Sequence, residues 1–242
     1  MMLDAHAADV PRDTGMTTQP TQLPSPGDGI DVYFFDLARS ADELAVLRVT
    51  LSPGEQMRAD RFGMPSLRDR YIAGRATLRQ ILGARLGMPP EQIDIRRGHR
   101  GRPHVVSAVN VDFNVSHTGG TALIGLTSQG RIGVDIEHEG RTLNVDGVAR
   151  KFMAPHEQAM LAGLEFDHRR RTLLRLWTCK EAMSKATGDA LSAPFRRMEV
   201  TLDDTSAHVR DGPSPYTPDA WTLHTIRAPG DHLATIALWQ EL

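Results

Sequence analysis

The alternation of apolar and polar positions predicts a mixture of short strands and helices along this chain. Strands are predicted at residues 30–35, 93–95, 121–126 and 131–137. Residues 128–130, Ser-Gln-Gly, predict a tight turn that joins the last two strands into a hairpin. Residues 96–103 contain several arginines with glycine and proline, and they predict a basic loop.

Helix boundaries are marked by caps, prolines and glycines. Ser52, Pro53 and Glu55 have the spacing of an N-cap, a first-turn proline and a capping-box partner. Three more helices are predicted: from Pro65 to about Leu86 with Gly87 as the stop, from Pro155 onward, and over residues 173–186 with Gly188 beyond the end.

A recurring spacing suggests an internal duplication. Arg75 and Lys180 each precede a glycine by eight positions, and each glycine precedes a proline by six, at a constant offset of 105 residues. An apolar-acidic-apolar triplet follows each proline. The pattern suggests two similar halves, each made of helices and strands, packed together with a cleft between them. We expect a disordered tail over residues 1–27, an N-terminal half over 28–130 and a C-terminal half over 131–242.

Composition narrows the possible functions. The 242 residues carry 28 basic and 30 acidic side chains, so the net charge of −2 argues against a general nucleic-acid binder. The single cysteine, Cys179, excludes a disulfide framework, and its place on a predicted apolar stripe argues against a nucleophile. No segment has the apolar length of a membrane span or the pattern of a secretory signal, so we expect a cytoplasmic protein without a membrane partner.

Candidate metal ligands come from two predicted elements. In the strand over residues 131–137, Asp135 and Glu137 point to the same side as Gly133. In the helix over 173–186, Glu181 and Lys185 share one face with Trp177, beside an apolar stripe. These patterns are typical of solvated surfaces, a hairpin face and a helix with a Glu–Lys pair. If Glu181 instead lies beside Asp135 and Glu137, the three carboxylates suit a hard cation, Mg²⁺ rather than Zn²⁺.

Other side chains could hold the phosphate groups that such a metal would contact. The hydroxyl of Ser116 is a possible donor, and positive charge could come from Arg58, Arg75, Arg79, Arg102, His117 and Lys185. Each of these cations taken alone is typical of a solvated surface. Common phosphate-loop, dinucleotide, serine-hydrolase and zinc-protease motifs are missing from the sequence.

Taken in order, several motifs resemble one family. They are Ser52-Pro53, Arg61-Phe62, residues 74–79 (Gly-Arg-Ala-Thr-Leu-Arg), Gly101-Arg102-Pro103, residues 113–117 (Phe-Asn-Val-Ser-His), residues 133–137 (Gly-Val-Asp-Ile-Glu) and residues 177–185 (Trp-Thr-Cys-Lys-Glu-Ala-Met-Ser-Lys). Over residues 30–240 the chain resembles the Sfp-type 4′-phosphopantetheinyl transferases. Its Trp/Lys-Glu-Ala motif is similar to that of one subgroup of this superfamily. The family fold, a pseudo-dimer of α+β halves, agrees with the offset of 105.

The resemblance implies that the chain moves 4′-phosphopantetheine from coenzyme A (CoA) to a serine of an acyl or peptidyl carrier domain. The other product is adenosine 3′,5′-bisphosphate. It implies Mg²⁺ ligands at Asp135, Glu137 and Glu181, and it places Lys185 beside the transferring phosphate. Glu181 is the candidate base, acting directly or through a metal-bound water. The implied CoA contacts are Arg58, Arg75, Gly101, Arg102, Pro103, Ser116, His117 and Lys185. We expect a monomer that binds CoA and a carrier domain but no nucleic acid.

Two other functions remain open for such a chain. One is a non-catalytic module that binds CoA or a carrier. The other is a Mg²⁺-dependent nucleotide hydrolase, which would release adenosine 3′,5′-bisphosphate without a carrier. The sequence does not name the carrier or its pathway, because fatty-acid, polyketide and nonribosomal-peptide carriers present a similar helix and serine.

Overall fold

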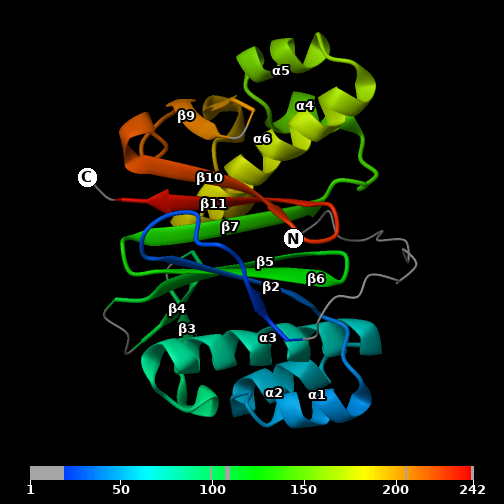
Figure 1. Cartoon of the computed structure of the whole chain (residues 1–242), viewed down its shortest axis with the longest axis vertical. Helices are drawn as coiled ribbons and strands as arrows, with labels where there is room; N and C mark the ends of the chain where they lie inside the picture. The colour runs from blue at the N-terminus through cyan, green and yellow to red at the C-terminus, as the bar shows by residue number, and fades with distance from the viewer. Residues whose placement is uncertain (1–18, 99, 107–109, 205, 241–242) are drawn as a thin grey trace.

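The structure is a computed structural model that describes residues 19–98, 100–106, 110–204 and 206–240. Figure 1 shows two sheets in the middle of the molecule, with helices covering its two ends. The predicted α+β class is confirmed, and so are the two halves.

The N-terminal half contains a four-stranded antiparallel sheet of order β1-β2-β6-β5. Its strands are β1 (Thr21–Gln22), β2 (Ile30–Asp36), β5 (Asp112–Thr118) and β6 (Thr121–Thr127). Its helices are α1 (Ala41–Arg48), α2 (Pro53–Asp60), α3 (Pro65–Leu86) and the 3₁₀ turn η1 (Pro90–Gln92). A separate hairpin consists of β3 (Ile95–Arg97) and β4 (Pro103–Val105).

The C-terminal half contains a five-stranded sheet of order β7-β11-β10-β9-β8. Its strands are β7 (Arg131–His138), β8 (Glu199–Leu202), β9 (Ala207–Asp211), β10 (Trp221–Ala228) and β11 (His232–Trp239). Its helices are α4 (Val145–Phe152), α5 (Pro155–Ala162), α6 (Phe166–Thr187) and the 3₁₀ turns η2 (Ala190–Ser192), η3 (Phe195–Arg197) and η4 (Pro218–Ala220).

Apolar burial occurs within each half and also between them. One cluster packs α3 against the N-terminal sheet, and a second packs α6 against the C-terminal sheet. A third cluster joins the sheets, with Val32 and Leu123 from the first and Ile132, Val134 and Ile136 from the second. The side of β7 that the sequence predicts to be apolar is therefore the contact between halves.

A ladder of side chains joins the facing edges of the two sheets. On β5, Asp112 accepts a hydrogen bond from the Ile132 amide (2.7 Å) and Asn114 accepts one from the Val134 amide (3.1 Å). Ser116 Oγ accepts from the Ile136 amide at 3.4 Å. Alternate residues of β5 thus satisfy alternate backbone donors of β7, which fixes the register between the halves.

Several predicted element boundaries are confirmed. Ser52 and Glu55 form the capping box of α2, and α3 runs from Pro65 to Leu86. Gly87 and Gly188 end α3 and α6 in the left-handed conformation, with φ of 63° and 84°. Glycine carries no Cβ, so this conformation is accessible at both helix ends.

Other sequence expectations need correction. The expected tail was too long, because Thr21–Gln22 pair with β2, while residues 1–18 lie outside the described residues. The predicted strand at 93–95 begins instead at Ile95, and the predicted loop at 96–103 includes most of a paired hairpin. Helix α6 begins at Phe166 rather than at residue 173, because residues 166–171 are mostly polar and exposed and so carry no apolar stripe that the sequence pattern could detect.

The duplication is visible, but its offset changes along the chain. Arg79 on α3 binds Glu55 (2.6 Å) and the Pro90 carbonyl (2.7 Å). Lys180 on α6 binds Glu157 (2.5 Å) and the Phe195 carbonyl (2.8 Å). Lys180 therefore corresponds to Arg79, not to Arg75 as the constant offset of 105 predicts, because extra residues including η2 follow α6.

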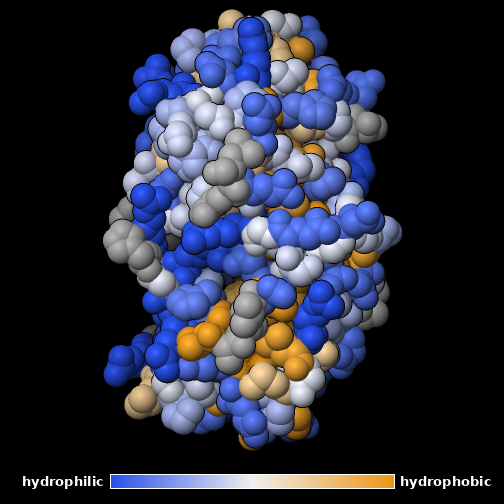
Figure 2. All heavy atoms as spheres, turned by 90° about the vertical axis from the view of Figure 1, so that its left-hand side faces the viewer, coloured by the Kyte–Doolittle hydropathy of each residue, from blue (hydrophilic) through white to orange (hydrophobic). Residues whose placement is uncertain are grey.

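The surface in Figure 2 is mostly hydrophilic around the boundary between the halves, and its larger apolar area lies over the N-terminal half. In the described residues, no helix combines the length and apolar content that a membrane crossing requires.

Candidate active site at the junction of the halves

The two candidate carboxylates of β7 lie inside the molecule. Asp135 is 5% exposed and Glu137 is 6% exposed, which rules out a solvated hairpin face. They face α6, which approaches β7 so closely that a Cβ on Gly133 would overlap the Ala182 carbonyl oxygen. The predicted α6 stripe is also buried, and Trp177 packs with Phe152 and Phe195.

Asp135 binds side chains from both halves. Its Oδ1 accepts a hydrogen bond from Ser116 Oγ of β5 at 2.9 Å and one from Lys185 Nζ of α6 at 2.6 Å. Lys185 Nζ is also 2.8 Å from Ser116 Oγ. Asp135 Oδ2 is buried without a hydrogen-bond partner. The chain therefore places one free carboxylate oxygen and one ammonium group at the junction.

The other two carboxyl groups have perturbed acidities. Burial, followed by repulsion from Asp135, raises the pKa of Glu137 to about 7, although Arg141 and Thr118 bind this side chain. Burial and then Asp135 also raise the pKa of Glu181 above its ordinary value. Mutual repulsion among partly buried carboxylates is the electrostatic setting that a bound cation relieves.

The donor set suits a hard divalent ion but does not form a closed ligand shell. In the described residues, no group of three or more His, Cys, Asp or Glu side chains is arranged to hold a metal ion. The orphaned Oδ2 of Asp135 and the carboxylates of Glu137 and Glu181 are nevertheless oxygen ligands of the kind that Mg²⁺ prefers. Mg²⁺ also keeps several waters and substrate oxygens in its shell, so an incomplete protein shell fits this ion.

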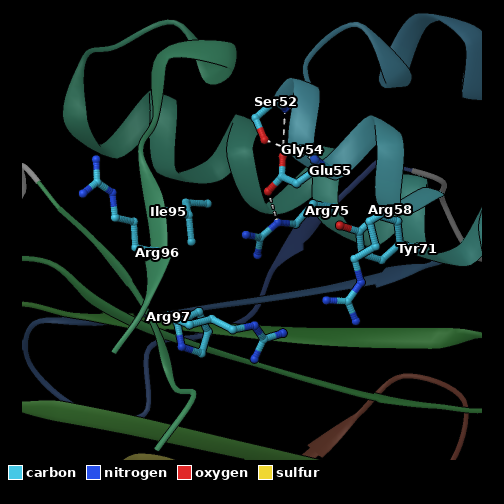
Figure 3. Close-up of a pocket in the computed structure, with 10 residues that line it drawn as sticks. Ser52, Gly54, Glu55, Arg58, Tyr71, Arg75, Ile95, Arg96 and Arg97 are labelled. Carbon is cyan, nitrogen blue, oxygen red and sulfur yellow. Dashed lines mark hydrogen bonds and ion pairs between the residues drawn. The ribbon is translucent and has the colours of Figure 1, made fainter. Parts of the chain in front are cut away.

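A basic hollow of about 320 Å³ lies between α2, α3 and the β3–β4 hairpin. Its walls include Arg58, Arg75 and Pro103, three of the predicted CoA contacts. Figure 3 shows Arg58, Arg75 and Arg97 directed towards the same open space, whereas Arg96 points away from it. Glu55 holds Arg75 by an ion pair. This concentration of positive charge suits phosphate groups.

The remaining predicted CoA contacts lie elsewhere. Gly101 has a φ of 74° near the tip of the β3–β4 hairpin, and His117 is exposed on β5. Arg102 is 10% exposed at its side chain and binds Asp112 through two nitrogens, at 2.7 and 2.6 Å. The structure therefore brings Ser116 and Lys185 to Asp135 but leaves Arg102 inside a protein network.

Sequence reasoning missed three residues at these sites. Tyr71 lies in the wall of the hollow, where its ring is 5.5 Å from the Arg58 guanidinium carbon. Arg97 also lines it, and its signal was the arginine-rich run before Arg102. Asn114 joins the two halves, and the alternation of polar residues along β5 was its signal.

Comparisons with known proteins agree with this arrangement. Residues 131–237 match the model of the 4′-phosphopantetheinyl transferase superfamily, and residues 38–129 match a model described as 4′-phosphopantetheinyl transferase, N-terminal. The 4′-phosphopantetheinyl transferase HetI of Nostoc sp. is 33% identical over 236 residues, which cover 92% of this chain and 97% of that protein. This chain belongs to the 4′-phosphopantetheinyl transferase superfamily.

Further relatives carry the same family name. A putative 4′-phosphopantetheinyl transferase of Synechocystis is 33% identical, over 79% of this chain and 78% of the relative. The 4′-phosphopantetheinyl transferase Sfp of Bacillus subtilis is 24% identical, over 70% of this chain and 74% of the relative. The predicted family and the predicted enzyme class, a phosphopantetheinyl transferase, are thereby confirmed.

Proposed function

We propose that this transferase moves the 4′-phosphopantetheine moiety of CoA to a serine of an acyl or peptidyl carrier domain at the junction of its halves. The contact of Asp135 with Lys185 and Ser116 is the observation that carries the proposal, because it gathers residues of both halves at one buried carboxylate. The family match and the relatives' names support the same activity.

The basic hollow is the proposed site for the phosphate groups of CoA. Arg58, Arg75 and Arg97 supply fixed positive charge there, and an arginine fork suits phosphate oxygens. Ser116 and Lys185 extend the donors to the junction, where the pyrophosphate would face the acidic residues. His117, Gly101 and Pro103 remain expected CoA contacts.

The proposed reaction is an attack on the β-phosphorus of CoA. The carrier serine oxygen forms the new P–O bond, and the bond to the adenosine 3′,5′-bisphosphate leaving group breaks. Glu181 is the proposed base that accepts the serine proton. Lys185 offsets the negative charge of the leaving phosphate.

We assign Asp135, Glu137 and Glu181 as the residues that would hold Mg²⁺. When bound, this ion would withdraw charge from pyrophosphate oxygens and restrain their geometry. The unpartnered Asp135 Oδ2 and the raised pKa values of Glu137 and Glu181 support the assignment.

We further propose that the chain acts as a monomer in the cytoplasm. Both faces of the junction come from one chain, so the proposed site needs no second subunit. Light scattering of the purified protein should give the mass of one chain, and a dimer would contradict this proposal.

The decisive experiment incubates the protein with CoA, Mg²⁺ and a panel of apo carrier domains. Intact-mass analysis should show one added phosphopantetheine on a carrier and release of adenosine 3′,5′-bisphosphate. Absence of any mass gain across the panel would reject the activity, and product release without a carrier would indicate a nucleotide hydrolase. CoA binding without transfer would indicate a non-catalytic module.

Substitutions test the residue assignments in the same assay. Asp135→Ala and Glu181→Ala should lower transfer at least about 10²-fold, because each removes a proposed Mg²⁺ ligand and the second also removes the proposed base. Asp60→Ala, which removes an exposed acid of α2, is the matched control and should leave transfer unchanged. Circular dichroism should show that all three variants are folded.

A further inference from the structure

The hairpin β3–β4 contacts the C-terminal end of α6, although these elements belong to different halves. Arg100 on the hairpin binds Asp189 at 2.5 Å, just beyond the helix. A Cβ on Gly188, the residue that ends α6, would lie 3.4 Å from Cβ of Arg102. The contact lies within a few residues of Lys185.

Arg102 makes the polar part of this contact. Its Nε donates to the backbone carbonyl of Lys185 at 3.1 Å. That carbonyl is one of the last four in α6, which the helix itself leaves without donors. A guanidinium at the C-terminal end of a helix also interacts favourably with the helix dipole.

The rest of the guanidinium is held by the N-terminal sheet and β7. Asp112 accepts from Nη1 and Nη2, and Nη2 also donates to the Ile132 carbonyl at 2.7 Å. Asp112 in turn accepts from the Ile132 amide. All three nitrogens of Arg102 are thus engaged by protein acceptors, which leaves no free fork for a ligand phosphate.

We propose that Arg102 is a positioning residue that fixes the last turn of α6, and with it Lys185, against Asp135. The inference rests on the proposed function for its catalytic meaning, and it replaces the direct CoA contact that the family resemblance implies for Arg102. Through this residue, the hairpin that forms one wall of the basic hollow also supports the ammonium group at the junction.

The three lysines of the chain allow a test that does not depend on transfer. Lys185 is held by Asp135 and Ser116, Lys151 is exposed, and Lys180 is fully buried. Brief acetic anhydride labelling, read by peptide mass, gives the ratio of Lys185 to Lys151 modification. Arg102→Gln should raise this ratio several-fold, whereas Arg96→Ala, which removes an exposed arginine of the same hairpin, should leave it unchanged. An unchanged ratio in a folded Arg102→Gln protein overturns the proposal.

Steady-state kinetics of transfer give the second measurement. The concentration of active sites is taken from the stoichiometry of CoA binding measured by calorimetry. Arg102→Gln should lower kcat by about 10-fold to 100-fold with little change in KM for CoA, because a displaced catalytic group slows the chemical step. In a Lys185→Ala background, Arg102→Gln should lower kcat only slightly further, since Arg102 acts through Lys185. A raised KM with normal kcat, or two fully independent effects, would contradict the proposal.

If Arg102→Gln fails to fold, Arg102→Lys takes its place in the labelling experiment. Lysine keeps the charge but cannot reproduce the fork that joins Asp112, Ile132 and α6, so the Lys185 ratio should still rise. If the wild-type chain transfers no phosphopantetheine, the labelling ratio still decides the positioning role, and only the proposed function fails.

Discussion

Lys180 and Lys185 lie on the same helix, but their side chains have different surroundings. Lys180 is fully buried and binds Glu157 and two backbone carbonyls, whereas Lys185 is partly exposed and binds Asp135 and Ser116. Glu157 also accepts the Ala154 and Val200 amides, so its charge is fully engaged. One lysine therefore stabilises the half, and the other belongs to the proposed active site.

Replacing Lys180 should be costly for folding. Lys180→Met leaves the buried Glu157 carboxylate without its cation, which should lower the free energy of unfolding by about 3–5 kcal/mol. Urea unfolding measured by fluorescence gives this difference. Arg48→Met, which breaks the exposed pair with Asp60, is the matched control and should have little effect. Equal decreases in the free energy of unfolding for the two variants would show that the buried pair stabilises the fold no more than the exposed pair does.

At the scale of elements, the contact between α6 and β7 sets the distance between Glu181 and the carboxylates of β7. Gly133 lets the helix backbone lie directly on the strand, and Gly125 lets β6 approach Val134, whose Cγ1 would be 2.6 Å from an added Cβ. Both glycines are required by close approach of other atoms, and neither has a positive φ.

Gly133→Ala should therefore affect activity as well as stability. The added methyl group overlaps the Ala182 carbonyl, so α6 must move away from β7 and separate Glu181 from Asp135. We expect the free energy of unfolding to fall by about 1–3 kcal/mol. Transfer activity should fall by more than the loss of folded protein explains. Thermal unfolding and the carrier assay measure the two effects.

Gly63→Ala provides the control for that substitution. A Cβ at Gly63 would meet no atom within 4 Å, so this variant should retain normal stability and transfer. Normal transfer in Gly133→Ala would mean that the helix position is not critical for the carboxylate group.

At the scale of the whole molecule, the halves are joined by the apolar cluster, the β5 ladder and His232. The His232 ring of β11 lies 5.6 Å from Phe34, and its Nε2 is 3.2 Å from Thr121 Oγ1, both in the N-terminal half. Nδ1 donates to the Pro229 carbonyl at 2.7 Å. Burial is the main cause that lowers the pKa of His232 below its ordinary 6.5.

This lowered pKa predicts acid sensitivity of the junction. The unfolded chain binds a proton at His232 more readily than the folded chain does. The contribution of neutral His232 to the free energy of unfolding is therefore complete above pH 6.5, and it is lost as the pH falls through the pKa of the folded state. The free energy of unfolding should fall by up to about 1.4 kcal/mol per pH unit from this group. Urea titrations between pH 5 and 8 measure it.

His232→Gln separates this effect from other titrations. The difference in unfolding free energy between wild type and His232→Gln should be largest near neutral pH and should shrink as the solution becomes acidic. A difference that stays constant over the range would show that His232 does not titrate with the predicted preference.

The sequence by itself determined the family, the α+β class and many helix and strand boundaries. Caps such as Ser52 with Glu55, helix-ending Gly87 and the alternation around Asp135 are local signals, since they depend on residues a few positions apart. Motif order along the chain also placed Asp135, Glu181 and Lys185 in one proposed site.

Only the tertiary structure decided which of these groups meet. Arg102 resembles a ligand contact in sequence, but Asp112, Ile132 and Lys185 occupy its guanidinium because the two halves fold against each other. The correspondence of Lys180 with Arg79 likewise appears only when both buried ion pairs are seen. Contacts between distant segments depend on how the sheets pack, and the local pattern of residues does not encode that packing directly.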